Sequence, residues 1–194
     1  MIALALLVVS CAKKTDNAAK TTDSTSMAKP AMSPVERGKY LVTAVAGCGD
    51  CHTPFKMGPH GPEPDMSRML SGHPEGMKMP PAPKMQMPWM ASIAATFTCF
   101  SGPFGTSYAK NLTPDTSGLG KWDEATFLLA IKNGKHIGTG RPIMPPMPWM
   151  VFKNMTDDDL KAIFAYLKTI PPVKNNVPEY EPPAGGPPMA GGKH

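Results

Sequence analysis

Five consecutive residues, Cys48-Gly49-Asp50-Cys51-His52, carry the strongest chemical signal in this sequence. Covalent haem attachment needs such a run: two thiols add across the vinyl groups of the porphyrin, and the following imidazole lies under the iron. The same C-x-x-C spacing occurs in dithiol oxidoreductases and in half of a zinc site. A dithiol enzyme would have a strand before the motif, and a zinc site would have a second ligand pair. The sequence indicates neither, so we predict one covalently bound haem c on Cys48 and Cys51, with His52 as an axial ligand of the iron.

A second axial ligand could come from the proline-rich segment 143–149, which reads Ile-Met-Pro-Pro-Met-Pro-Trp. A thioether is a soft, neutral ligand that favours ferrous iron, so His/Met ligation raises the reduction potential and suits an electron carrier. The flanking prolines stiffen the segment and help to hold the sulfur in place. We predict Met147 as the distal ligand, with Met144 as the second choice. The alternative is that both methionines only pack on the haem face.

Two other groups of residues give weaker signals. Cys99 has no assigned partner, and we expect it to be a small buried hydrophobic residue; an intermolecular disulfide is the alternative. The central part of the chain also combines histidines with many methionines, which are possible copper ligands: His60, His73, Met77, Met79, Met85 and Met87. Since methionine fills apolar positions freely elsewhere in this chain, the copper hypothesis is the less favoured one.

A helix is predicted immediately before the haem motif. In Ser33-Pro34-Val35-Glu36, the serine can cap the amide of Glu36, the glutamate can reach back, and the proline suits the first helical position. The predicted helix delivers Cys48 at its end, and its apolar face carries Tyr40, Leu41, Ala44 and Val45.

Two more helices are predicted in the second half of the chain. Asp123 is a suitable N-cap for a helix that ends at Gly134, and its apolar residues are Phe127, Leu128 and Ile131. The last helix begins at Thr156, has three aspartates in its positive first turn and ends before Pro171. Its expected buried residues are Leu160, Ile163, Phe164 and Leu167.

The 24 prolines limit how much of the 194 residues can be regular, because proline is excluded from helix interiors and central strands. We therefore expect an all-α domain at 33–175, interrupted by a long irregular loop at 53–107 that is rich in proline and methionine. A bound haem could organise such a loop. The Pro/Gly-rich residues 176–194 are expected to form a disordered tail.

The N-terminal residues resemble a lipoprotein signal. The apolar residues Ile2 to Val9 are followed by Ser10 and Cys11, and the similarity to the bacterial lipobox rests on Val8-Val9-Ser10-Cys11. Eight apolar residues are too few for a membrane-spanning helix, which needs about 20. We predict a signal segment at 1–11 with lipidation at Cys11, and a flexible tether at 12–32. An ordinary signal segment with an incidental cysteine is the alternative.

The net charge of +5 and the pI of about 9.0 come from scattered lysines and arginines. No basic run interleaves with aromatic residues, so nucleic-acid binding is not expected. A mildly basic surface is compatible with docking to an acidic redox partner.

The order of these elements resembles class I c-type cytochromes: helix, haem motif, later helices, methionine segment and final helix. The chain from Glu36 to Val173 is more narrowly similar to bacterial monohaem cytochromes related to the cytochrome subunits of membrane-bound alcohol dehydrogenases. The motifs that carry this similarity are Asn111-Leu112-Thr113-Pro114-Asp115, Gly118-Leu119-Gly120-Lys121-Trp122 and Pro146-Met147-Pro148-Trp149.

The resemblance implies a class I cytochrome c fold in which the first and last helices cross, with Gly38 and Tyr40 against the helix that contains Phe164 and Tyr166. It also implies that Met147 is the distal ligand. The dehydrogenase subunits usually carry several haem motifs, whereas this sequence contains one.

We therefore expect an electron-transfer protein in a periplasmic or extracytoplasmic respiratory chain, anchored to a membrane by lipidated Cys11. A dehydrogenase or quinol-oxidising complex would donate the electron, and a terminal oxidase or reductase would accept it. The protein is not expected to be an enzyme, since no general-base or nucleophile constellation appears. The alternatives are a haem enzyme or sensor with an open distal site, which would be peroxidase-like, and a cytochrome subunit of a dehydrogenase complex.

Overall fold

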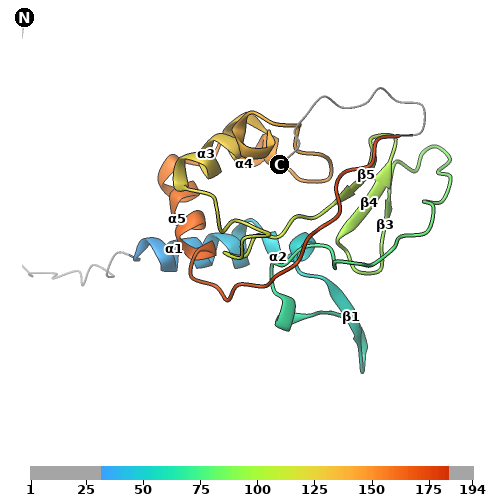
Figure 1. Ribbon diagram of the computed structural model, residues 1–194, viewed down its shortest axis with the longest axis horizontal. Coiled ribbons are helices and arrows are strands. Elements are labelled where there is room, and N and C mark those ends of the chain that lie inside the picture. Colours follow the sequence, from blue (N-terminus) through green and yellow to red (C-terminus); the bar gives the residue numbers. More distant parts are fainter. Residues whose placement is uncertain (1–31, 184–194) are drawn as a thin grey trace, which may run out of the picture. The chain divides into compact units, whose positions relative to one another are not determined.

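The computed structural model describes residues 32–183 (Figure 1). The predicted signal segment at 1–11 with Cys11, the tether up to residue 31 and the tail from residue 184 lie outside this range. Within residues 32–183, no helix has the length and hydropathy required to cross a membrane.

The segment before the haem motif is helical, but it forms two short elements, and the motif itself forms a third. Helix α1 (Pro34–Tyr40) begins with the expected capping box, in which Ser33 and Glu36 bond each other's backbone amides. A π-helical turn, Leu41–Val45, follows directly, and its last hydrogen bond joins the Ala46 amide to the Leu41 carbonyl at 2.7 Å. Gly47 then adopts a left-handed conformation (φ 58°) that ends this turn and redirects the chain into α2 (Cys48–His52).

The later helices begin and end where their capping residues predict. Asp123 accepts a hydrogen bond from the Thr126 amide at the start of α3 (Glu124–Asn133), and Gly134 ends that helix with φ 62°. Thr156 caps α5 (Asp157–Leu167). Between them lie a 3₁₀ turn at His136–Gly138 and the short α4 (Trp149–Phe152).

Helices α1 and α5 cross against each other (Figure 1), and Gly38 lies at their contact. A methyl group at Gly38 would collide with the backbone of Ala162 and come within 2.8 Å of the Cβ of Tyr166, so only glycine permits this approach. The implied crossing is confirmed for Gly38 and Tyr166. Tyr40, in contrast, is 47 % exposed, because it lies on the opposite side of the short helix beneath the guanidinium of Arg37.

Within residues 32–183, a hydrophobic core joins the π turn, α3 and α5. Its buried residues come from both halves of the chain: Leu41, Val42, Leu70, Leu119, Phe127, Ile131, Leu160, Ala162, Ile163, Phe164, Tyr166, Leu167 and Ile170. The four residues expected to be buried on the last helix are all part of it.

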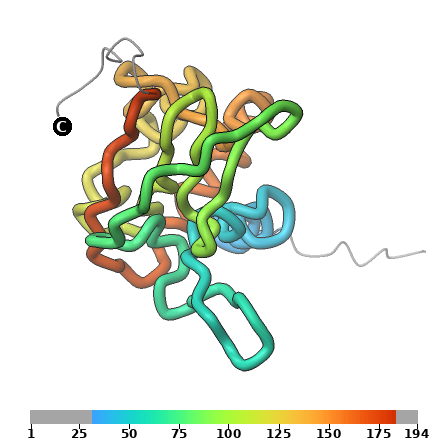
Figure 2. Tube along the Cα trace, turned by 90° about the vertical axis from the view of Figure 1, so that its right-hand side faces the viewer, coloured from blue at the N-terminus to red at the C-terminus, as the bar shows by residue number. Residues whose placement is uncertain are grey.

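The expectation of an all-α domain with an irregular loop at 53–107 needs correction. Strands β1 (Phe55–Gly58) and β2 (Gly61–Pro64) form an antiparallel hairpin, which projects from the rest of the domain in Figure 2. A 3₁₀ turn follows at Met66–Arg68. Strands β3 (Ser92–Ile93), β4 (Cys99–Gly102) and β5 (Gly105–Tyr108) form a second antiparallel sheet. Each strand has two to four residues, which is too short for an alternating hydrophobic pattern to stand out in the sequence.

The expected disorder from residue 176 onward is wrong for residues 176–183. We call residues 173–183 the C-terminal strap; it runs back from α5 along the domain to β5 (Figure 2). Glu181 and Thr106 exchange both backbone hydrogen bonds, at 2.8 and 2.9 Å, and the Tyr180 hydroxyl donates to the Phe104 carbonyl at 2.6 Å. Prolines on both sides of residue 175 prevent a helix, but they still allow the segment to pair with the edge of a sheet.

Asn175 is the central anchor of the strap and is fully buried. Its side-chain amide donates to the carbonyls of Ser71 and His73 at 2.7 and 2.8 Å. Its side-chain oxygen accepts from the Glu75 amide at 2.7 Å and from Arg68 at 3.0 Å. One side chain thus satisfies polar groups that the irregular segment 68–75 cannot pair within itself.

Gly38→Ala should destabilise the domain by about 1–3 kcal/mol or more, because the added methyl meets the backbone of Ala162 and not a side chain that can move. Gly58→Ala is the matched control, since its methyl meets only the flexible carboxylate end of Glu63. Denaturant unfolding of both variants measures the effect, and equal stabilities would contradict the close crossing.

Asn175→Ala should lower the free energy of unfolding by about 2–4 kcal/mol, because it leaves buried carbonyls and a guanidinium without partners. Asn176→Ala serves as the control: it is adjacent but exposed, and its side chain bonds only the exposed Glu75 carboxylate. Both variants are compared by urea unfolding, and the anchor role of Asn175 is wrong if they are equally stable.

Asp159→Asn should remove a pH-dependent contribution to stability. Arg37 pairs with Asp159 through two hydrogen bonds of 2.8 and 3.2 Å and holds the pKa of that carboxyl below its ordinary 3.8. The pair therefore contributes fully above about pH 4 and is lost as the pH falls through the lower pKa of the folded state. Unfolding midpoints should differ between the native chain and the variant at pH 7, and the difference should shrink as the pH falls below about 4, whereas a difference that stays constant would contradict this assignment.

Candidate haem site

Helix α2 presents the two cysteines of the motif one helical turn apart. Cys48 and Cys51 are both free thiols and half-buried, and Cys48 also contacts the hydrophobic core. Burial raises the pKa of Cys48 to about 11 and raises that of Cys51, so both thiols carry their protons at neutral pH. A thiol in this form can add its sulfur and its hydrogen across a vinyl group, as thioether formation requires. Helical segments precede the motif, and not the strand that a dithiol oxidoreductase would have.

The imidazole of His52 is held by a backbone carbonyl. Its Nδ1 lies 2.7 Å from the carbonyl oxygen of Lys110, and since a carbonyl can only accept, Nδ1 carries the proton. Nε2 is therefore the nitrogen with a lone pair. Burial lowers the pKa of His52, which keeps the ring neutral. A neutral imidazole oriented through its other nitrogen is the usual state of a metal-binding histidine.

A ladder of backbone hydrogen bonds places the Lys110 carbonyl beside α2. The His73 amide donates to the Ala109 carbonyl, and the Leu112 amide donates to the Leu70 carbonyl, both at 2.9 Å. Gly72 lies between them, donates to the His52 carbonyl at 2.7 Å and has φ 79°. A Cβ at Gly72 would collide with the backbone of residues 109 and 110, so glycine is required at this position.

Sequence reasoning did not find Lys110 or Gly72. Lys110 acts through its main-chain oxygen, which every residue possesses, so its side chain carries no signal. Gly72 could have been suspected only as a glycine that needs a left-handed conformation.

Met147 lies on the turn that precedes α4, and it is half-buried against the same hydrophobic core that Cys48 contacts. Its amide donates to the Met144 carbonyl at 3.2 Å. The segment is tied down on two sides, because the Ser107 hydroxyl donates to the Pro145 carbonyl at 2.6 Å and the Ile143 amide donates to the Gly134 carbonyl at 2.8 Å. Met144 is also half-buried but is not among the side chains on that core, whereas Met69 and Met155 are.

These residues fit a haem by their chemistry. Two protonated thiols stand one turn apart, a neutral imidazole has its Nε2 lone pair free of the Lys110 bond, and soft thioethers lie against the same core. Within residues 32–183, no group of three or more His, Cys, Asp or Glu side chains gathers as a metal-ion site would require.

The remaining candidates from the sequence have these positions. Cys99 is buried in β4, as expected, and burial raises the pKa of its thiol to about 11. Of the two histidines in the copper hypothesis, His60 is exposed in the β1–β2 turn, while His73 is buried and bonded through Nδ1 to Thr98. Met87 is largely exposed.

Comparison with known proteins connects this geometry to a family. Residues 35–171 match the family described as Cytochrome c. The chain is 28 % identical over 151 residues to the fructose dehydrogenase cytochrome subunit of Gluconobacter japonicus, covering 77 % of this chain and 24 % of that protein. It is 40 % identical over 65 residues to the cytochrome c subunit of a quinone alcohol dehydrogenase from Gluconacetobacter polyoxogenes, covering 33 % and 14 % of the two chains.

A third relative is a nicotinate dehydrogenase subunit of Pseudomonas putida, at 40 % identity over 77 residues, or 39 % of this chain and 6 % of that protein. The chain thus spans less than a quarter of the length of these relatives. Proteins with this domain carry a covalently bound haem and transfer electrons. Because the match runs from the first described helix through the last, this chain belongs to the cytochrome c family.

Proposed function

We propose that the domain is a single-haem electron carrier in which Cys48 and Cys51 hold the haem, His52 is the proximal ligand and Met147 is the distal ligand. The observation that carries the proposal is the 2.7 Å bond between His52 Nδ1 and the Lys110 carbonyl. It leaves Nε2 as the only ligating nitrogen of the imidazole, next to two thiols on the same helix. A bound haem c supplies a one-electron couple between Fe(III) and Fe(II).

The protein's own residues would hold this couple at a suitable potential and shield it from water. Lys110 fixes the imidazole's tautomer and orientation, and a hydrogen bond to Nδ1 strengthens His52 as a donor. A thioether at the sixth position favours the ferrous state and raises the reduction potential. The core that Cys48 and Met147 contact would exclude water from that side of the site.

The redox partners follow from the chemistry and from the relatives. Several relatives are cytochrome subunits of fructose, alcohol or gluconate dehydrogenases, so we propose a dehydrogenase as the electron donor, with a quinol-oxidising complex as the alternative. A terminal oxidase or reductase would accept the electron. The names of these relatives also favour a second candidate function, in which the chain is itself a cytochrome subunit of such a dehydrogenase complex.

We also propose an extracytoplasmic location, because covalent haem attachment takes place outside the cytoplasm in bacteria that make such proteins. Cys11 in its lipobox-like context would supply the membrane anchor. Together with the tether that follows, it would keep the domain near membrane-bound redox partners.

Haem content tests the proposal directly. The chain, expressed with a cytochrome c maturation system, should give an alkaline pyridine haemochrome spectrum of c-type haem, with one haem per chain. The double variant Cys48→Ser/Cys51→Ser should contain no haem that remains attached to the denatured chain. Cys99→Ser should keep its covalently attached haem. A native chain without covalent haem would end the proposal.

Met147→Leu should abolish the methionine-sulfur charge-transfer band of the ferric protein and lower the reduction potential, because the soft neutral ligand is lost. The ferrous variant should then bind carbon monoxide, which the native protein should not. Absorption spectra and redox titration provide the measurements.

Met144→Leu is the matched control, three residues earlier on the same segment, and it should keep the band. Met69→Leu tests another methionine on the core. If Met144→Leu or Met69→Leu removes the band and Met147→Leu does not, then Met147 is not the ligand. A native protein without the band that binds carbon monoxide would favour the haem enzyme or sensor with an open distal site.

A further inference from the structure

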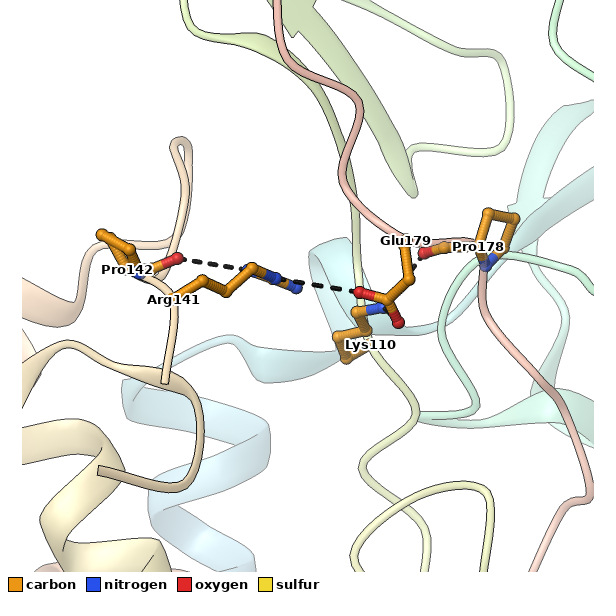
Figure 3. Close-up of polar contacts among 5 residues, drawn as sticks. All are labelled: Lys110, Arg141, Pro142, Pro178 and Glu179. Carbon is orange, nitrogen blue, oxygen red and sulfur yellow. Dashed lines mark hydrogen bonds and ion pairs between the residues drawn. The ribbon is translucent and has the colours of Figure 1, made fainter. Parts of the chain in front are cut away.

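Glu179, on the C-terminal strap, lies between two cations from distant parts of the chain (Figure 3). Its carboxylate is 2.9 Å from Nζ of Lys110 and 3.8 Å from Nε of Arg141. The Lys110 ammonium also donates to the Pro178 carbonyl at 3.0 Å. Two consecutive strap residues therefore bind one lysine, and one of them also pairs with an arginine.

Lys110 connects this cluster to the proximal histidine. Its carbonyl accepts the proton of His52 Nδ1, while its side chain is held by Glu179 and Pro178. A partly buried ammonium needs polar partners, and Glu179 and Pro178 supply them, so the strap holds the Lys110 side chain in one position.

Arg141 connects the cluster to the methionine segment. Its side chain is only 17 % exposed, and its guanidinium donates to the Pro142 carbonyl at 3.1 Å. Its own carbonyl accepts the His136 amide at 2.9 Å, so Arg141 fixes the start of the segment that leads to Met147. One carboxylate is thus shared between the residue that holds the imidazole of His52 and the segment that leads to Met147.

An isolated exposed ion pair would contribute little, because solvent screens it and the side chains lose freedom. This cluster differs in two ways. Both cations are at most 30 % exposed, while the Glu179 side chain is 54 % exposed, and the three charged groups are linked to each other and to main-chain carbonyls. The strap also lies beyond residues 35–171, so its role is not implied by the family match.

We propose that Glu179 is a positioning residue of the haem site, which ties Lys110 on the His52 side to Arg141 on the Met147 side and thereby sets the reduction potential of the bound haem. This inference rests on the proposed function, because it assumes a haem held by His52 and Met147. The C-terminal strap then belongs to the redox site and is not an appendage of the cytochrome domain.

The sign of the effect follows from the charges. Glu179→Gln keeps the size and the polarity of the side chain but leaves two adjacent cations without their shared anion. Uncompensated positive charge near the iron disfavours Fe(III) relative to Fe(II). The reduction potential should therefore shift to a more positive value.

The matched control is Glu181→Gln, which removes the same charge two residues further along the strap. The Glu181 carboxylate accepts from the Tyr108 hydroxyl at 2.7 Å, and its backbone pairs with Thr106. Redox titrations of the full-length holoproteins at pH 7 compare the two variants with the native chain. Glu179→Gln should give the clearly larger positive shift, with haem content and the methionine-sulfur band retained in both.

A double variant tests whether Glu179 acts through the lysine. In a Lys110→Met background, Glu179→Gln should shift the potential less than it does in the native background, because one of its two cations is gone. Equal shifts for Glu179→Gln and Glu181→Gln, or no shift for either, would overturn the inference. A native chain that binds no covalent haem would instead end the proposed function, so the two failures are distinguishable.

Discussion

The hydrogen bond from His52 Nδ1 to the Lys110 carbonyl is the interaction on which the proposed haem site depends. It decides which imidazole nitrogen would be available to the iron and sets the direction in which the ring faces. A histidine ligand binds a metal well only if its tautomer and its ring orientation are fixed before the metal binds. Much of the domain's irregular structure can be understood as the means of holding residue 110 against α2.

Lys110 is held from two sides. Its main chain lies between the 70–112 and 73–109 backbone hydrogen bonds, and Gly72 allows the two segments to approach closely. Its side chain is bound by the C-terminal strap. Lys110, whose carbonyl orients His52, is thus also held in place through its side chain. Its ammonium would put a positive charge near the proposed haem.

A chain so rich in proline cannot satisfy its buried backbone groups through long helices and sheets. Buried amide and hydroxyl side chains take over part of this task. Asn111 accepts from the Thr113 amide and donates to the Val173 carbonyl, while Asn175 bonds four groups of the segment 68–75. These contacts explain why the strap is ordered without forming a helix.

The sequence by itself determined the local elements and the chemistry of the motif. The caps at Ser33, Asp123 and Thr156 specify where helices begin, because a side chain and an amide three residues apart decide it. Spacing alone predicted haem attachment at Cys48 and Cys51, and the family match supports a covalently bound haem. Gly38 was implied at the helix crossing by resemblance, and its position there is confirmed.

Tertiary structure alone decided the rest. The five strands have two to four residues each, so their pairing depends on partners elsewhere in the chain and not on a pattern within each strand. Lys110 acts through a main-chain oxygen that no residue type reveals, and Glu179 acquires its role from two cations 69 and 38 positions away in the sequence. Such contacts join segments that are far apart in the sequence. Residue spacing within one segment cannot predict them, because only the fold brings the segments together.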